Sequence, residues 1–136
     1  MSIVQTQTTS FKAELYQGVH DLLTDTLKIA LFTANANLGA ETTVYSTQNE
    51  VSGSGYTPGG IQLTGVTINT NGYTAYVNFN DANFGAAVTA RCALIYNASK
   101  SDKSIAVLDF GSDKTSASFK ITMPANSPTT ALIRTS

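Results

Sequence analysis

The sequence contains few of the side chains that carry chemistry. It has no tryptophan, a single histidine (His20) and a single cysteine (Cys92), and only 12% of its residues are charged. An ordinary soluble domain has about 25% charged residues. Enzymes bring acids, bases, nucleophiles or metal ligands together at one place. We therefore predict a protein that acts through its surface, with no enzymatic activity, no cofactor and no metal.

Charge and hydropathy exclude further classes of partner. The net charge is −1, and strongly basic clusters are what nucleic acids and anionic membranes attract, so we expect neither as a partner. No apolar run reaches the ~20 residues of a membrane span, and the first residues lack the regions of a signal peptide. A single cysteine suits a reducing compartment. We therefore expect the chain to be made in the cytoplasm of its producing cell.

The N-terminal part predicts an arm followed by a helix. We expect one domain over residues 1–136, and its first segment, 1–9, is polar and has the composition of an arm that packs little. Helical spacing then predicts one amphipathic helix over 10–23. Gly18 lies inside this helix, at a cost of about 1 kcal/mol relative to Ala. The predicted apolar stripe consists of Phe11, Leu15, Val19, Leu22 and Leu23.

Strands are predicted along the rest of the chain. Residues 26–34, 89–97 and 104–110 are apolar on both faces, which is typical of central, well-buried strands. Residues 116–123 alternate between apolar and polar side chains, and 129–135 form a last strand. Short strands with hairpin links and one helix are typical of an antiparallel sandwich, a jelly roll or a small barrel. We predict a mainly β fold: an antiparallel, jelly-roll-like β-sandwich with one short N-terminal amphipathic helix.

The clearest local signal is the dipeptide Asn71-Gly72. It favours a type I′ hairpin turn, because both central positions of that turn need positive φ. The turn predicts a register in which Ile68 faces Ala75, with Val77 on the same, inner face of the hairpin.

Residues 35–60 form a long polar loop with no sustained period. Loops of this length in a compact domain are usually functional or mobile. Its glycine-rich part, 53–60, lacks the Lys-Ser/Thr and the helix of a phosphate loop. Tyr45 and Tyr56 are its candidate contact residues, because tyrosine offers apolar area with a polar tip. Ordinary loop packing of both side chains is the alternative.

The remaining reactive residues have simple structural explanations. We interpret His20 as a surface or helix-end histidine and Cys92 as a buried, unreactive thiol. The carboxylates are scattered, with no marked pair of the kind that a glycosidase needs. Asp109 lies inside an apolar strand, where Arg91 or Lys120 is a candidate partner and an edge or interface position is the simpler explanation. Residues 81–83 are a weak match to calcium ligands, without the rest of an EF-hand loop.

A resemblance covers nearly the whole chain. The residues that carry it are Phe11, 18–20, 25–33, Leu38, 42–45, 50–60 and 92–97. Their pattern of turn glycines and aromatics resembles a family of small structural proteins of tailed bacteriophages, and within it the capsid cement (decoration) proteins of Bordetella podoviruses. The resemblance implies a jelly-roll-like sandwich that clamps a capsid shell as a homodimer. The family has no catalytic residues to transfer.

We therefore expect a structural virion protein that binds the outer surface of a bacteriophage capsid and bridges major capsid protein subunits. The alternative is a virion or tail surface module that binds host glycans. We predict that the arm and the long loop make the contacts to the partner. The predicted contact residues are Val4, Gln5, Thr6, Tyr45, Tyr56, Thr57 and Pro58.

Overall fold

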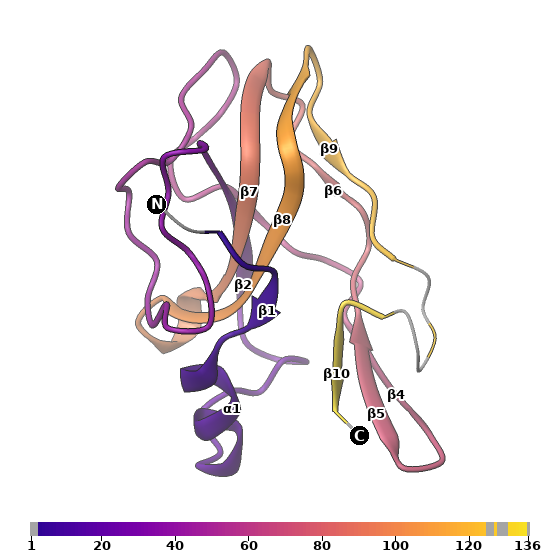
Figure 1. Cartoon of the computed structure of the whole chain (residues 1–136). Helices are drawn as coiled ribbons and strands as arrows, with labels where there is room; N and C mark the ends of the chain where they lie inside the picture. The colour runs from indigo at the N-terminus through magenta and orange to yellow at the C-terminus, as the bar shows by residue number, and fades with distance from the viewer. Residues whose placement is uncertain (1–2, 125–126, 128–130, 136) are drawn as a thin grey trace.

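The computed structural model describes residues 3–124, 127 and 131–135. It is mainly β, with antiparallel sheets and one short helix (Figure 1). The largest sheet has five strands in the order β1-β8-β7-β2-β3. Its strands are β1 (Thr6–Gln7), β8 (Lys103–Ser116), β7 (Val88–Asn97), β2 (Leu27–Phe32) and β3 (Ile61–Gln62).

The three central strands confirm the sequence prediction. β2 lies within the predicted strand 26–34, and its pairing with β7 runs without interruption from Leu27 opposite Asn97 to Phe32 opposite Cys92. A 3₁₀ turn, η1 (Ala98–Lys100), joins β7 to β8. β8 begins at Lys103 and continues beyond the predicted end at residue 110.

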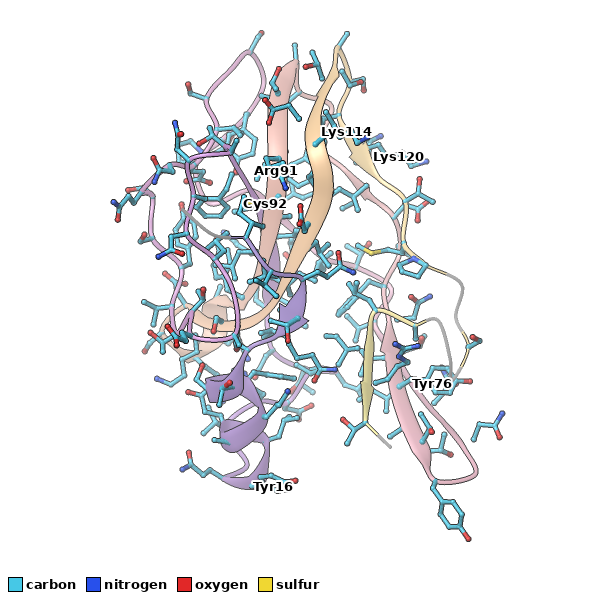
Figure 2. The ribbon with its side chains drawn as sticks, in the orientation of Figure 1. Tyr16, Tyr76, Arg91, Cys92, Lys114 and Lys120 are labelled. Carbon is cyan, nitrogen blue, oxygen red and sulfur yellow. The ribbon has the colours of Figure 1, made fainter. Side chains whose placement is uncertain are left out.

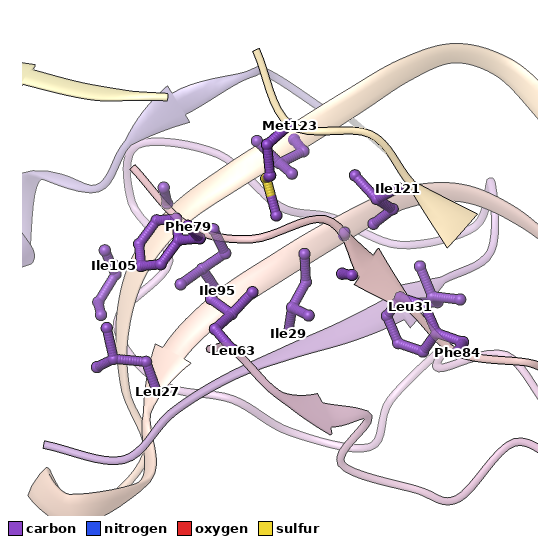
Figure 3. Close-up of a cluster of buried hydrophobic side chains, with 14 of the residues drawn as sticks. Leu27, Ile29, Leu31, Leu63, Phe79, Phe84, Ile95, Ile105, Ile121 and Met123 are labelled. Atoms are coloured by element: carbon purple, nitrogen blue, oxygen red, sulfur yellow. The ribbon is translucent and has the colours of Figure 1, made fainter. Parts of the chain in front are cut away.

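Both faces of the five-stranded sheet are covered, which explains why its central strands are apolar throughout. On one face, Leu27, Ile29 and Leu31 belong to the larger core cluster. On the other face, Ala30 and Phe32 belong to a second cluster, which includes residues from the long loop and the arm. Figure 3 shows side chains of the larger cluster, among them Leu27, Ile29, Leu31, Leu63, Phe79, Phe84, Ile95, Ile105, Ile121 and Met123.

Two smaller sheets complete the architecture. One has three strands in the order β10 (Ile133–Thr135), β5 (Thr74–Asn78) and β4 (Thr67–Asn71). The other pairs β6 (Ala82–Asn83) with β9 (Lys120–Ile121). The β4–β5 hairpin extends away from the five-stranded sheet (Figure 1). Buried residues of both small sheets join the larger core cluster.

The helix α1 (Thr9–Tyr16) is shorter than the predicted 10–23, and Gly18 is the reason. Gly18 has a φ of 70°, a conformation that glycine adopts without the penalty of a Cβ. Its N–H binds the carbonyl of Leu15, and the N–H of Val19 binds the carbonyl of Glu14. This pair of bonds is the Schellman motif that ends helices. Gly18 therefore stops the helix, and the prediction that it lies in the interior is wrong.

The predicted apolar stripe of the helix is also wrong. Phe11 is the buried residue of α1, whereas Leu15 is 38% exposed and Leu23 is 60% exposed. Leu22 is buried, but it lies in the turn after the helix. Because α1 ends after two turns, the later leucines do not continue its face.

The hairpin turn lies one residue later in the chain than predicted. Asn71 pairs with Thr74 and Ile68 pairs with Val77, so the two turn residues are Gly72 and Tyr73. Gly72 has a φ of 60°, and positive φ at the first turn position is the pattern of a type II′ turn, where glycine is favoured. The predicted pairing of Ile68 with Ala75 is therefore wrong. Each residue of β4 pairs two positions further along β5 than predicted. A shift of two positions keeps every side chain on its face, so the residues predicted to share a face still share it.

The C-terminal segments form less strand than predicted. Within 116–123 only Lys120 and Ile121 belong to β9. The alternation correctly places Phe119, Ile121 and Met123 in the core, but Ala117, predicted on the same face, is exposed. Within 129–135 the strand is Ile133–Thr135, while residues 129 and 130 lie outside the described part of the chain. Buried and exposed side chains thus alternate in these segments although few of the residues pair with a neighbouring strand.

The predicted arm is part of the fold from residue 3 onward. Thr6 and Gln7 pair with Val107 and Ala106 of β8. Thr8 is fully buried, and its hydroxyl accepts a hydrogen bond from the Phe11 N–H at 3.3 Å as the helix N-cap. Residues 1 and 2 lie outside the described part. The expectation that 1–9 packs little is wrong for the residues that the structure describes.

Candidate partner-binding surface

Glu50 organises the long loop. Its two carboxylate oxygens accept hydrogen bonds from the hydroxyls of Tyr45 and Tyr56, both at 2.5 Å. The second oxygen also accepts the N–H of Gly59 at 2.8 Å. Hydrogen bonds to an ionised acceptor are the short, strong ones. Glu50, Tyr45, Tyr56 and Gly59 form what we call the Glu50 cluster.

The Glu50 cluster is attached to the five-stranded sheet at two points. The Tyr56 oxygen accepts the N–H of Leu31 in β2 at 3.0 Å. The hydroxyl of Tyr96 in β7 donates to the carbonyl of Gly59 at 2.6 Å. The loop is therefore held along the β2 edge of the sheet, where Val51 also donates its N–H to the carbonyl of Leu31.

Close backbone packing explains one glycine of this loop. Gly60 has a φ of 80°, and a Cβ built on it would overlap the carbonyl oxygen of Ile29. No other residue fits this approach without moving the backbone. Gly60 thus sets the distance between the loop and β2.

Aromatic contacts reinforce this attachment on both faces of the sheet. The rings of Tyr45 and Tyr96 stack with centroids 4.5 Å apart and planes 13° apart. Phe32 meets Tyr45 edge-on at 6.3 Å, and Tyr56 stacks on Phe84 at 6.1 Å. Such pairs add stabilisation beyond the area they bury.

The two loop tyrosines stay protonated far above neutral pH. Burial, followed by the hydrogen bond to Glu50 and its charge, raises the pKa of Tyr45 well above its ordinary value of 10. The same causes raise the pKa of Tyr56. Burial also raises the pKa of Tyr96 to about 12. These hydroxyls act as donors within the fold.

The structure places the predicted contact residues in two groups. In the arm, Val4 is 52% exposed, Gln5 is exposed with its amide oxygen accepting the N–H of Asp109 at 3.0 Å, and Thr6 is half-buried in β1. In the loop, the hydroxyls of Tyr45 and Tyr56 face Glu50, while Thr57 and Pro58 are exposed.

The arm and the long loop meet. The N–H of Val4 binds the carbonyl of Leu38 at 3.0 Å, and the N–H of Thr9 binds the carbonyl of Ala40 at 2.9 Å. Ile3 and Leu38 form an isolated parallel bridge and pack on the second core cluster. The arm and the first part of the loop therefore meet over the face of the sheet that carries the second core cluster, whereas Tyr56, later in the loop, packs on the larger cluster.

His20 is not the surface histidine that we predicted. Its side chain is completely buried, with Nε2 2.8 Å from Glu14 Oε1 and Nδ1 2.9 Å from the amide nitrogen of Asn97. The Asn97 oxygen accepts the N–H of Ser99, so its nitrogen is the donor to Nδ1. The Nε2–H tautomer of His20 then donates to Glu14. The role of this histidine is to satisfy buried polar groups.

The other reactive side chains are also engaged within the fold. Cys92 is fully buried, and burial raises the pKa of its thiol to about 12, which is unfavourable for a nucleophile. Asp109 pairs with Arg91, with Nε and Oδ1 3.2 Å apart, which confirms one of its two candidate partners. Among the described residues, no three His, Cys, Asp or Glu side chains form a metal-binding group.

Comparisons with known proteins give no relative for this chain. It matches no protein-family model, no curated protein and no solved structure at a significant level. In the described part of the chain, no helix is long and apolar enough to cross a membrane.

The Glu50 cluster escaped the sequence analysis, although one signal points to it. From Thr42 to Asn80, Glu50 is the only charged residue. A lone charge between two tyrosines in an uncharged segment needs hydrogen-bond donors if it is even partly buried. This reasoning identifies Tyr45 and Tyr56 as its partners.

Proposed function

We propose that this chain is a structural virion protein that binds the outer surface of a bacteriophage capsid. It stabilises the shell by bridging major capsid protein subunits. It is made in the host cytoplasm and resides on the capsid surface. The resemblance to phage structural proteins, carried by Phe11, 18–20, 25–33, Leu38, 42–45, 50–60 and 92–97, supports this proposal.

The observation that carries the proposal is the construction of the loop and arm surface. Residues 35–60 have little regular structure, yet Glu50, Tyr96 and Gly60 hold them against the sheet. Val4 joins the arm to them through Leu38. A pre-organised surface loses little entropy on binding, as a protein that clamps a shell requires.

Binding of this kind stabilises a shell by mass action. A protein that binds the assembled state in preference to free subunits shifts the equilibrium toward assembly. Many copies on one particle add their effects through multivalency. The exposed Thr57 and Pro58 of the loop and the exposed Val4 and Gln5 of the arm offer the mixed polar and apolar contacts of a non-obligate interface.

We further propose a jelly-roll-like sandwich that acts as a homodimer. The larger core cluster supports the sandwich, because it joins residues of the five-stranded sheet with residues of both smaller sheets. The uncharged sequence of β4, an edge strand, supports self-association, since exposed edges without Lys or Pro pair readily. Sedimentation analysis tests the dimer directly, and a monomer at all concentrations refutes it.

The test of the function compares phage particles with and without this chain. Particles that lack it should lose their DNA at a lower temperature than complete particles, and adding the purified protein should restore retention. A variant with Thr57→Asp and Pro58→Asp tests the surface, with Asn83→Asp as the control away from it. Equal heat stability of the two kinds of particle would refute the role of cement.

The glycan-binding alternative receives less support. Sugar-binding sites use accessible aromatic faces and hydroxyls, whereas the hydroxyl of Tyr56 is engaged with Glu50 and its ring lies beside Phe84. Glycan-array binding by the purified protein that is lost in Tyr56→Ala would favour this alternative over the capsid role.

A further inference from the structure

A groove separates the helix from the C-terminal strand. It has a volume of about 620 Å³ and is lined by α1, β1 and β10. β1 is an edge of the five-stranded sheet, and β10 is an edge of the three-stranded sheet. Figure 1 shows β1 directly above α1 and β10 to the right of both. The groove thus lies between two unpaired sheet edges.

The strand edges leave backbone groups directed into the groove. The N–H of Thr8 binds Ile105 in β8, and hydrogen-bonded positions alternate along an antiparallel pair, so the N–H of Gln7 points away from β8. Arg134 lies opposite Tyr76, and its carbonyl accepts the side-chain amide of Gln7 at 3.0 Å. The N–H of Arg134 points in the same direction as its carbonyl, away from β5. The Gln7 amide therefore occupies a position that the backbone N–H of an added strand would take.

The groove is positively charged. Lys12 and Arg134 line it, and neither has an ion-pair partner within the described ranges. The four ion pairs of those ranges involve other residues. Two cations on opposite walls favour a ligand that carries negative charge.

The helix wall adds apolar area. Leu15 is 38% exposed and Tyr16 is 93% exposed, and both line the groove. Figure 2 shows Tyr16 extending from the end of α1. Exposed aromatic and aliphatic side chains beside free cations are typical anchors of protein interfaces.

We propose that this groove binds an extended, acidic segment of a partner protein as an added strand along β10. The segment exchanges backbone hydrogen bonds with Arg134, displaces the Gln7 amide, and places carboxylates near Lys12 and the Arg134 guanidinium. Strand addition of this kind takes affinity from the backbone and specificity from alternate side chains. This inference rests on the proposed function, for which the acidic segment belongs to the shell.

Protein is favoured over nucleic acid by the same observations. A nucleic acid needs an extended basic footprint, whereas this chain has a net charge of −1 and the groove offers two cations with strand-edge N–H groups. A second copy of this chain is the remaining occupant.

The test uses amide NMR of the full chain. The probe is an acetylated, amidated eight-residue peptide of alternating Glu and Val, and the matched controls are the Lys-Val peptide and a short oligothymidylate. The acidic peptide should shift the amide resonances of Gln7 and Arg134. Lys12→Glu with Arg134→Glu should weaken binding by about tenfold or more, while Lys114→Glu, an exposed cation of β8, should change it by less than about twofold.

Each other outcome overturns the proposal. Equal binding of the Lys-Val peptide or of oligothymidylate refutes an acidic protein segment, and unshifted Gln7 and Arg134 amides refute the groove. If the chain forms a dimer, and the double substitution Lys12→Glu with Arg134→Glu dissociates that dimer, the groove is an interface between copies. The two tests fail independently. A peptide that does not bind the groove does not affect the heat-stability test of the particles, and particles of equal heat stability do not affect the peptide measurement.

Discussion

The hydroxyl of Tyr56 donates a 2.5 Å hydrogen bond to Glu50 Oε2. The same hydroxyl oxygen accepts the N–H of Leu31, so Tyr56 connects the loop carboxylate to β2. Tyr45 binds the other oxygen of Glu50. One charged side chain thus joins two tyrosines and a strand.

Replacement of Glu50 should destabilise the whole domain. Glu50→Gln removes the charge from two hydrogen bonds, each of which contributes about 1.5–3 kcal/mol when one partner is ionised. We expect the free energy of unfolding in urea to fall by about 2–4 kcal/mol. Glu41→Gln, at an exposed loop position, should change it by less than about 0.5 kcal/mol. A loss at Glu50 no larger than at Glu41 would contradict the role of the cluster.

Stability should fall as the pH rises above about 10. The pKa of Tyr45 and Tyr56 is raised in the folded state by burial and by Glu50, and that of Tyr96 is raised to about 12. Below pH ~10, the value in an unfolded chain, both states keep these protons and the stabilisation is complete. Above it, the unfolded chain loses protons that the folded chain retains, so the free energy of unfolding decreases.

Denaturant unfolding between neutral pH and about pH 11 measures this dependence. Tyr56→Phe should flatten the alkaline decline because it removes one of the shifted hydroxyls. Tyr73→Phe is the matched control, since Tyr73 is fully exposed at the hairpin tip. Identical slopes for both variants would be inconsistent with the Glu50 cluster.

Asn97→Ala should lower stability and weaken its dependence on acid. Asn97 donates to His20 and to Asp25, and loss of a buried partner costs about 1–3 kcal/mol for each group left unsatisfied. Burial raises the pKa of Asp25, but hydrogen bonds from Asn97 and the Asp21 N–H, with the charge of Lys100, lower it below 3.8 overall. The stabilisation from Asp25 is therefore complete above that pH and is lost as the pH falls through the folded-state pKa.

Urea titrations at several pH values below neutral, on wild type and on Asn97→Ala, check both effects. Asn37→Ala, at an exposed position, serves as the control and should remain within about 0.5 kcal/mol of wild type. An acid dependence that Asn97→Ala leaves unchanged would mean that Asp25 owes its lowered pKa to other groups.

Two positions on one face of β5 should respond differently to a charge. Val77 is 8% exposed and belongs to the larger core cluster, so Val77→Asp should unfold the domain or destabilise it by about 3 kcal/mol or more. Ala75 lies two residues along on the same face but is exposed, so Ala75→Asp should cost less than about 1 kcal/mol. Circular dichroism during thermal unfolding measures both, and equal losses would show that the core reaches Ala75.

Apolar composition was enough to predict the central sheet. The strands over 26–34, 89–97 and 104–110 follow from side chains that are apolar on both faces, because only a sheet covered on both sides buries them. The end of the helix at Gly18 was not predicted. A glycine is tolerated inside a helix at a modest cost, so its presence in the sequence does not say whether the helix continues or stops there. Gly18 ends α1 because its N–H binds the carbonyl of Leu15 and the N–H of Val19 binds the carbonyl of Glu14, which composition does not reveal.

The candidate surface was predicted as segments and not as contacts. The arm and the loop were chosen for their polarity, and the structure joins them at Leu38. The inward direction of Tyr45 and Tyr56 was missed, because it depends on Glu50 and on the approach of Gly60 to β2. Hydrogen-bond geometry in an irregular segment has no period to read from the sequence.

The shared carboxylate of Glu50 has a consequence for how the molecule opens. Tyr45, Tyr56 and Gly59 all donate hydrogen bonds to the carboxylate of Glu50. Breaking one of these bonds leaves the other two in place, whereas movement of Glu50 breaks all three. The loop should therefore behave as one cooperative unit of local unfolding, with amides from 45 to 60 exchanging their hydrogens with a common opening free energy. A surface that opens as a whole stays intact until it is lost as a whole.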